Sequence, residues 1–312
     1  MAVFFNTTAQ GSHIGTLCLI YRVLRRATDK EITVDKLKAL CAPDTLARKS
    51  NHKTKFQDML TFWGKDFHKI WSINEDGKLS LIPDHVTKNP NPTPEEISMV
   101  VRSALFKKPI ETITTAKNDN KYTTEPLFLC LSCFLACEAH GPFDKVPINK
   151  SAIASSLRER LGTGTDYALN EEEFSGLIEW MLFLGFANLN HGDVVIDPTR
   201  VVKDALNEIF RLKATLPIRE FINKIGHLIP VFDGGDYHKQ TILLMKSNGW
   251  EYNYDKKMSS SLSLALHRLQ IENLITLVPG SDDLDSIEMD EPISMQSKAI
   301  AAITFREFKT NA

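Results

Sequence analysis

The stretch that decides the fold is Phe56-Gln-Asp-Met-Leu-Thr-Phe-Trp63, followed by Ile70-Trp-Ser-Ile73 and Leu79-Ser-Leu-Ile82. Its first part has apolar residues at the three-to-four spacing of one helix face. The two short apolar runs after it have the composition of strands. Between them lies Glu75-Asp76-Gly77, which predicts a hairpin turn because glycine adopts positive φ at no steric cost. The stretch therefore predicts a helix followed by a two-stranded hairpin.

Two helices upstream complete a unit that recurs along the chain. The first covers residues 13–27 and the second starts at Val34, with Thr33 as its N-cap. A second copy runs from Leu127 to Ile196, and a third, looser copy from Ile218 to Met289. Each copy has helix, short helix, amphipathic helix and two short strands in that order. The sequence therefore predicts a threefold internal repeat.

One passage of the third copy carries a resemblance to a known family. Leu262-x-x-Ala265-Leu266-x-Arg268-Leu269, followed by Leu274-Ile275 and a hairpin, resembles the recognition-helix-to-wing passage of winged-helix proteins. The resemblance implies a mainly α protein with small β-hairpin wings, built of tandem winged helix-turn-helix units. The overall layout also resembles winged-helix accessory proteins of bacterial phage-defence and DNA-modification clusters, including the deazaguanine-inserting kind.

The repeat and its linkers predict four segments. Residues 1–84 form an N-terminal winged helix, 85–124 a linker with one helix, and 125–200 a second winged helix; residues 201–312 hold a helical bridge, the third unit and a C-terminal tail. The linker is proline-rich from Lys88 to Pro94, and Thr93 before Pro94 predicts the start of its helix. The tail from Pro292 either docks on the body or reaches a partner.

Composition excludes several classes of protein. The 312 residues are 43% hydrophobic with a net charge of −2, which excludes a disordered, collagenous or coiled-coil chain. The first residues do not form a signal peptide, and the longest apolar stretch, Leu127 to Cys137, is about half of the roughly 20 residues that span a bilayer. Five cysteines, an odd number, suit a reducing compartment. We expect a cytoplasmic protein with no membrane partner.

The distribution of charge separates the copies. Residues 13–84 hold 13 Lys and Arg against 9 Asp and Glu, whereas residues 125–200 hold 5 against 11. Basic residues gather at the third helix of the first copy, the helix that enters the major groove in DNA-reading proteins of this kind. The predicted contacts to duplex DNA are Arg48, Lys49, Asn51, Lys53, Thr54, Lys55, Lys65 and, in the wing, Lys78. A solvated positive surface is the alternative.

Acidic residues predict a different role for the later copies, because carboxylates repel phosphate. The predicted contacts to protein subunits, or to a second copy of this chain, are Glu171, Glu172, Glu179, Asp282, Asp283 and Asp285. Helix-dipole complementarity and plain solvation are the alternatives. On the third helix of the third copy, Ser261, Ser263, His267 and Arg268 are expected to be partly exposed, which suits a groove.

No catalytic pattern is present in the sequence. The loop Gly162-Thr-Gly-Thr165 lacks the ending of a phosphate-binding loop, and Asp233-Gly-Gly-Asp236 is interpreted as a turn. Cys130, Cys133, Cys137 and His140 span about 15 Å of one helix, so they cannot all bind one zinc ion. We therefore predict no enzyme activity, no cofactor, no metal and no small-molecule substrate.

These observations favour a DNA-binding adaptor, an accessory subunit of a DNA-processing or phage-defence assembly. The N-terminal unit would contact duplex DNA and the acidic units would contact protein. One alternative is a sequence-specific transcription regulator, which would bind half-sites as a dimer. The other is a winged-helix scaffold that binds only protein.

Overall fold

The computed structural model describes a large part of the chain. The described residues are 13–27, 31–43, 52–64, 70–107, 125–137, 155, 157, 159–161, 171–191, 193–250, 256–280, 285–291 and 297–307. Within them, the side chains of residues 52–54, 125, 126, 171, 172 and 193 are not described.

The N-terminal part contains three helices and a small sheet. Its elements are α1 (Ile14–Arg26), β1 (Ile32–Thr33), α2 (Val34–Cys41), α4 (His52–Gly64), β2 (Trp71–Ile73), β3 (Lys78–Leu81) and the short 3-10 helix η1 (Pro83–His85). The strands form an antiparallel sheet in the order β1-β3-β2. The predicted hairpin is present, and Gly77 in its turn has a φ of +72°. Strand β1 was not anticipated by the sequence analysis.

The predicted helix face of residues 56–63 forms the core of this part. Phe56, Met59, Leu60 and Trp63 are all buried, against Tyr21 of α1. The indole N–H of Trp71 donates a hydrogen bond to the carbonyl of Leu60 at 3.1 Å. The hairpin is therefore fixed directly to α4.

The linker helix begins as predicted. In α5 (Pro94–Phe106), the Thr93 side chain accepts a hydrogen bond from the Glu96 N–H, and the Glu96 carboxylate accepts one from the Thr93 N–H. This reciprocal pair is a capping box, and Pro94 occupies the first helical position. The helix packs against both α1 and α8.

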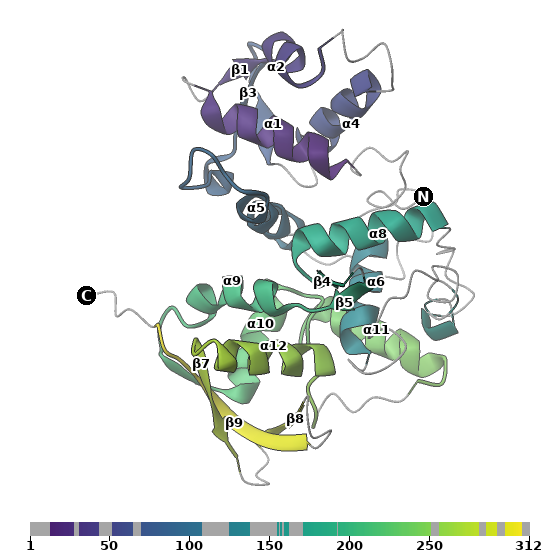
Figure 1. Ribbon diagram of the computed structural model, residues 1–312, viewed down its shortest axis with the longest axis vertical. Coiled ribbons are helices and arrows are strands. Elements are labelled where there is room, and N and C mark those ends of the chain that lie inside the picture. The colour runs from purple at the N-terminus through teal and green to yellow at the C-terminus, as the bar shows by residue number, and fades with distance from the viewer. Residues whose placement is uncertain are drawn as a thin grey trace.

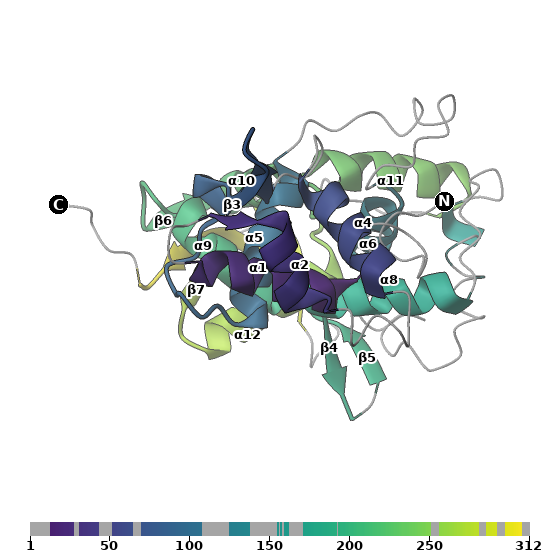
Figure 2. The same cartoon turned by 90° about the horizontal axis from the view of Figure 1, so that it is seen from above.

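The middle of the chain contains a second helix-and-hairpin set. Its elements are α6 (Glu125–Ala136), α8 (Glu171–Leu184), β4 (Ala187–Asn190), β5 (Asp193–Ile196) and α9 (Thr199–Ile209). Residues 155, 157 and 159–161 are also helical. The predicted pairing of β4 with β5 is confirmed, and Figure 2 shows this hairpin extending beyond the helices around it.

The C-terminal part holds the largest sheet. Its elements are β6 (Thr215–Pro217), α10 (Ile218–Leu228), α11 (Asp236–Ser247), α12 (Ser260–Ile271), β7 (Ile275–Pro279), β8 (Ile287–Asp290) and β9 (Ser297–Phe305). The predicted hairpin of β7 with β8 is wrong, because both strands pair antiparallel with β9. Strand β9 lies in the tail, so this segment docks on the body and carries buried Ile300, Ile303 and Phe305.

The protein is mainly helical, with small antiparallel sheets, as the sequence predicts at this level. Figure 1 shows the N-terminal helices at one end of the long axis, the sheet of β7, β8 and β9 at the other end, and α5 and α8 between them. Among the described residues no helix has both the length and the apolar character needed to cross a membrane.

Candidate functional site

The predicted DNA contacts are only partly described. Lys53 and Thr54 lie on the first turn of α4, Lys55 follows them and is half-buried, and Lys78 begins β3. The Lys78 side chain is exposed and forms an ion pair with the Glu31 carboxylate at 3.6 Å. Outside the described residues lie Arg48, Lys49, Asn51 and Lys65.

Three cations of the basic N-terminal part bind the chain itself. On α1, the Arg22 guanidinium donates to the Pro92 carbonyl at 3.1 Å, and Arg25 donates to the carbonyls of Thr87 and Lys88 at 3.0 and 3.2 Å. Arg26 donates to the side-chain oxygen of Asn91 at 2.7 Å. Part of the positive charge of residues 13–84 therefore serves the chain itself, because these arginines bind the proline-rich linker.

One end of α4 packs against α8. The rings of Trp63 and Trp180 are stacked, with centroids 6.2 Å apart and an interplanar angle of 28°, and both side chains are fully buried. Glu179, one of the predicted protein contacts, precedes Trp180 on α8 and is exposed. The third helices of the first and second units are thus held together by their aromatic residues.

The carboxyl end of α8 is fixed by side chains from α5 and α9. The Ser98 hydroxyl donates to the Phe183 carbonyl at 2.6 Å, and the Arg102 guanidinium donates to the Leu184 carbonyl at 2.6 Å. Arg200 of α9 donates to the Leu182 carbonyl at 3.0 Å. Cations favour this end of a helix because its last carbonyls carry partial negative charge.

Arg102 is buried, and burial lowers the pKa of its guanidinium, while the ion pair with Asp204 opposes that effect. The guanidinium thus bridges α8 to a carboxylate of α9. The three helices α5, α8 and α9 are consequently joined by hydrogen bonds and an ion pair.

The expectation that the polar residues of α12 are partly exposed is wrong for its serines, whereas His267 is half-buried and Arg268 is exposed. Ser261 and Ser263 are each 1% exposed. The Ser261 hydroxyl donates to the Leu135 carbonyl at 2.6 Å, and the Ser263 hydroxyl donates to the Ser259 carbonyl at 2.9 Å. Arg268 pairs with the buried carboxylate of Asp197. The two serines are therefore not offered to a groove.

The remaining acidic predictions are described in part. Glu171 and Glu172 lie on the first turn of α8, Asp285 is exposed just before β8, and Asp282 and Asp283 lie outside the described residues. The two carboxylates of Asp233-Gly-Gly-Asp236 do not converge. Asp233 is buried and accepts hydrogen bonds from Ser259, whereas Asp236 is exposed on the first turn of α11.

The cysteines of α6 are part of the core. Cys130, Cys133 and Cys137 are all buried, and burial raises the pKa of the Cys130 thiol to about 12. The Cys137 sulfur accepts a hydrogen bond from Arg160 at 2.8 Å. Across the described part of the chain, no three His, Cys, Asp or Glu side chains are grouped so that they could hold a metal ion.

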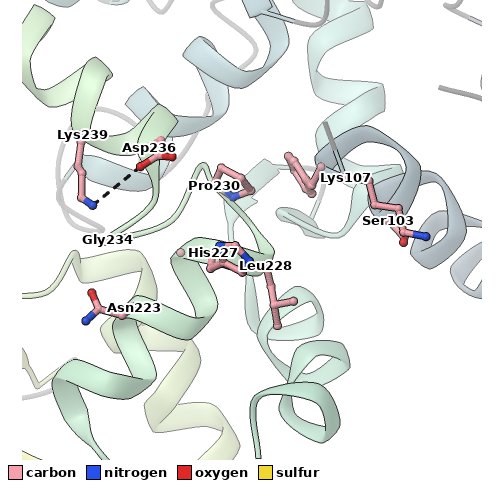
Figure 3. Close-up of a pocket in the computed structure, with 11 residues that line it drawn as sticks. Ser103, Lys107, Asn223, His227, Leu228, Pro230, Gly234, Asp236 and Lys239 are labelled. Carbon is pink, nitrogen blue, oxygen red and sulfur yellow. Dashed lines mark ion pairs between the residues drawn. The ribbon is translucent and has the colours of Figure 1, made fainter. Parts of the chain in front are cut away.

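A pocket of about 670 Å³ lies between α5, α10 and α11, and no sequence motif pointed to it. Figure 3 shows Lys239 and Asp236 of α11 on one side of His227, and Lys107 at the end of α5 on the other. The residues that line it are Ser103, Phe106, Lys107, Asn223, Gly226, His227, Leu228, Pro230, Gly234, Asp236 and Lys239. The lining comes from residues 103–107 and 223–239, two stretches that are far apart in the sequence, so spacing alone could not reveal the pocket.

A comparison with known proteins identifies the family. The model of a family described as DpdG-like matches residues 1–283 of the chain. No curated protein and no solved structure matches the sequence. DpdG proteins belong to Dpd clusters, which modify DNA in phage defence. Since the match covers most of the 312 residues, the chain belongs to the DpdG-like family.

Proposed function

We propose that this protein is a non-catalytic, DNA-contacting adaptor of a Dpd assembly. The observation that carries the proposal is the element order of residues 14–81. Helix, strand, helix, helix and two further strands follow one another, and the strands pair as β1-β3-β2. This is the order of a winged helix-turn-helix unit, in which α4 would be the recognition helix and the β2–β3 hairpin the wing.

The charges of this unit support contact with phosphate. Lys53 and Lys55 lie on the first turn of α4, and Lys78 lies on the wing, where its side chain is exposed. The ion pair of Lys78 with Glu31 is between exposed groups and contributes about 0–1 kcal/mol, so a phosphate can replace it. The unit would use these lysines, while the arginines of α1 hold the linker.

The later units would serve protein contacts. The middle set of elements repeats the order of helix and hairpin, whereas the C-terminal sheet departs from a winged helix because β6 precedes α10 and the tail supplies β9. Glu179 and Asp285 are exposed and would attract a basic partner surface. Ser261 and Ser263 of α12 are buried and bonded internally, so this helix is not proposed as a DNA reader.

Titration of a fluorescently labelled duplex, followed by polarisation, tests DNA contact. The double variant Lys53→Glu, Lys55→Glu should weaken binding at least about tenfold and lower the salt dependence by about two counterions, one for each lost phosphate contact. Lys298→Glu, at an exposed residue of β9, is the matched control and should bind like the parent. Equal affinities of the double variant and the parent at low salt would contradict the proposal.

The stacking of Trp63 on Trp180 favours a second candidate, a scaffold that binds only protein. In this case α4 serves to join two units, and its lysines are solvated. Co-purification with the other Dpd proteins separates the two functions. The scaffold predicts that capture of these proteins falls with Glu179→Lys and is indifferent to Lys53→Glu, Lys55→Glu, and that duplex DNA does not bind.

A further inference from the structure

The pocket between α5, α10 and α11 is preformed. A Cβ atom added to Gly226 of α10 would lie 2.4 Å from the nitrogen of Gly235, so the helix backbone packs directly on the loop before α11. Gly234 in this loop has a φ of +78°, a conformation that residues with a side chain rarely adopt. The wall that α10 and this loop form is therefore fixed by backbone contact.

Cationic side chains stand at two sides of the pocket. Lys107 and Lys239 are about half exposed, at 53% and 50% of their side-chain area. Their ion-pair partners Asp84 and Asp236 are more exposed, at 74% and 70%, with separations of 3.2 and 4.0 Å. Pairs of this kind contribute little free energy, so both ammonium groups are available to an anion that enters the pocket.

Polar and apolar groups divide the rest of the lining. Asn223 and His227 are exposed on α10 and present N–H donors, whereas Phe106, Leu228 and Pro230 supply apolar surface. The Phe106 ring packs on the ring of Phe128, with centroids 5.2 Å apart, which holds it in place. The pocket thus combines a cationic rim with an apolar wall.

We propose that this pocket binds a nucleoside monophosphate group, with the phosphate at the lysines and the base against Phe106, Leu228 and Pro230. Ligand pockets have volumes of roughly 300–1,000 Å³, and a volume of about 670 Å³ holds one nucleotide. The same group occurs in a free nucleotide and at the phosphorylated end of a DNA strand. Binding here is separate from duplex contact by α4 and does not depend on it.

Calorimetric titration of the full chain tests the proposal. The probes are the four deoxynucleoside monophosphates, the unphosphorylated nucleosides, inorganic phosphate, and a short single strand with and without a 5′-phosphate. At least one monophosphate should bind about tenfold or more tightly than its nucleoside and than inorganic phosphate, because each of these lacks one half of the contacts. A monophosphate that binds no better than inorganic phosphate would overturn the assignment.

The two single strands distinguish the sources of the ligand. If the 5′-phosphorylated strand binds more tightly than the mononucleotide, and the unphosphorylated strand does not bind, the ligand is a DNA end. Binding of the mononucleotide alone identifies a free nucleotide. Absence of binding by both overturns the proposal.

Substitutions at the rim give the residue-level test. Lys107→Gln and Lys239→Gln should each weaken nucleotide binding about tenfold, and Asp236→Asn should strengthen it several-fold by removing a repelling carboxylate. Lys298→Gln, on β9, is the matched control and should leave the affinity unchanged. All four positions carry exposed side chains, so the variants should keep the parent's circular dichroism and melting temperature. Unchanged affinity in both pocket-lysine variants would refute the site.

A cross-test separates this pocket from the proposed DNA surface. Lys78→Gln should weaken duplex binding and leave nucleotide binding as it is, whereas Lys239→Gln should do the reverse. Loss of the first effect alone contradicts DNA contact through the wing, and loss of the second alone contradicts the nucleotide pocket.

Discussion

The first and third units share one sequence pattern, a helix followed by two apolar runs, yet their strands pair differently. In the first unit β2 and β3 pair with each other around a turn in which the Gly77 N–H donates to the Asn74 carbonyl at 3.0 Å. In the third unit β7 and β8 both pair with β9, which comes later in the chain. The difference shows that a pattern of apolar runs specifies strands, while a turn specifies their partner.

The third helices of these units differ in the same sense. On α12, Arg268 pairs with the carboxylate of Asp197. Ser259 caps the helix and also donates a hydrogen bond to the carboxylate of Asp233. On α4, Phe56, Met59, Leu60 and Trp63 are buried, and Lys55 of the first turn is half-buried. Equal position in a repeat therefore does not give equal access to a partner.

Ile303→Ala should have the largest effect on the difference between the two sheets. Ile303 is fully buried in β9, at the position where β9 pairs with both β6 and β7. Its truncation should lower the free energy of unfolding by about 3 kcal/mol, because it leaves a cavity in the core beneath the sheet. Denaturant unfolding measures the loss.

Hydrogen exchange on the same variant should show deprotection of β7 and β9 and little change in β2 and β3. Uniform deprotection of both sheets would mean that the two units unfold as one, contrary to this expectation.

Ser259→Ala and Thr33→Ala compare the stability that two helix caps contribute in the third and first units. Ser259 accepts from the Leu262 N–H and donates to Asp233 at 2.6 Å, so its loss removes a cap and a partner of a buried carboxylate. We expect a loss of about 2 kcal/mol. Thr33 only accepts from the Lys36 N–H, at 3.4 Å, and its replacement should cost about 0.5 kcal/mol. Thermal melts compare the two, and equal costs would be inconsistent with the network around Asp233.

Acidification should weaken the C-terminal part through His238. Burial lowers the pKa of this imidazole, which Asp233 opposes and Lys239 reinforces, so the unfolded chain binds the proton more readily. Stability from the neutral ring is complete above the unfolded pKa of about 6.5 and falls below it, by at most about 1.4 kcal/mol per pH unit.

Exchange rates of α11 measured between pH 7.5 and 5.5 test this, and His238→Gln should remove the dependence. His85→Gln is the matched variant. Burial also lowers the pKa of His85, and its effect should appear in the segment around η1 and leave α11 unchanged.

Gly77→Ala should have a small effect. No atom lies within 4 Å of the added Cβ, so the cost comes only from the positive φ, about 1 kcal/mol. Gly280→Ala is the counterpart in the third unit, where the Cβ would lie 2.9 Å from that of Ser286. Urea titration of both variants measures the two costs. A neutral Gly77→Ala would show that this turn does not fix the hairpin.

Local features of the fold could be predicted from the sequence. The apolar spacing of Phe56 to Trp63, the turn at Gly77 and the cap at Thr93 each involve residues within one element or one turn. The pairing of β9 and the burial of Ser261 could not be predicted, because the partner strands of β9 and the hydrogen-bond acceptor of Ser261 belong to other elements of the chain. The pocket escaped for the same reason, since Lys107 and Lys239 line it from α5 and α11, which are far apart in the sequence.

The proline-rich linker has the composition of a flexible tether, but α1 holds it through three guanidinium groups and α5 continues it into the joint with α8 and α9. The two ends of the long axis are therefore connected by side-chain hydrogen bonds as well as by the backbone. In the proposed adaptor, this connection would set the spacing between a duplex bound at one end and a protein bound at the other.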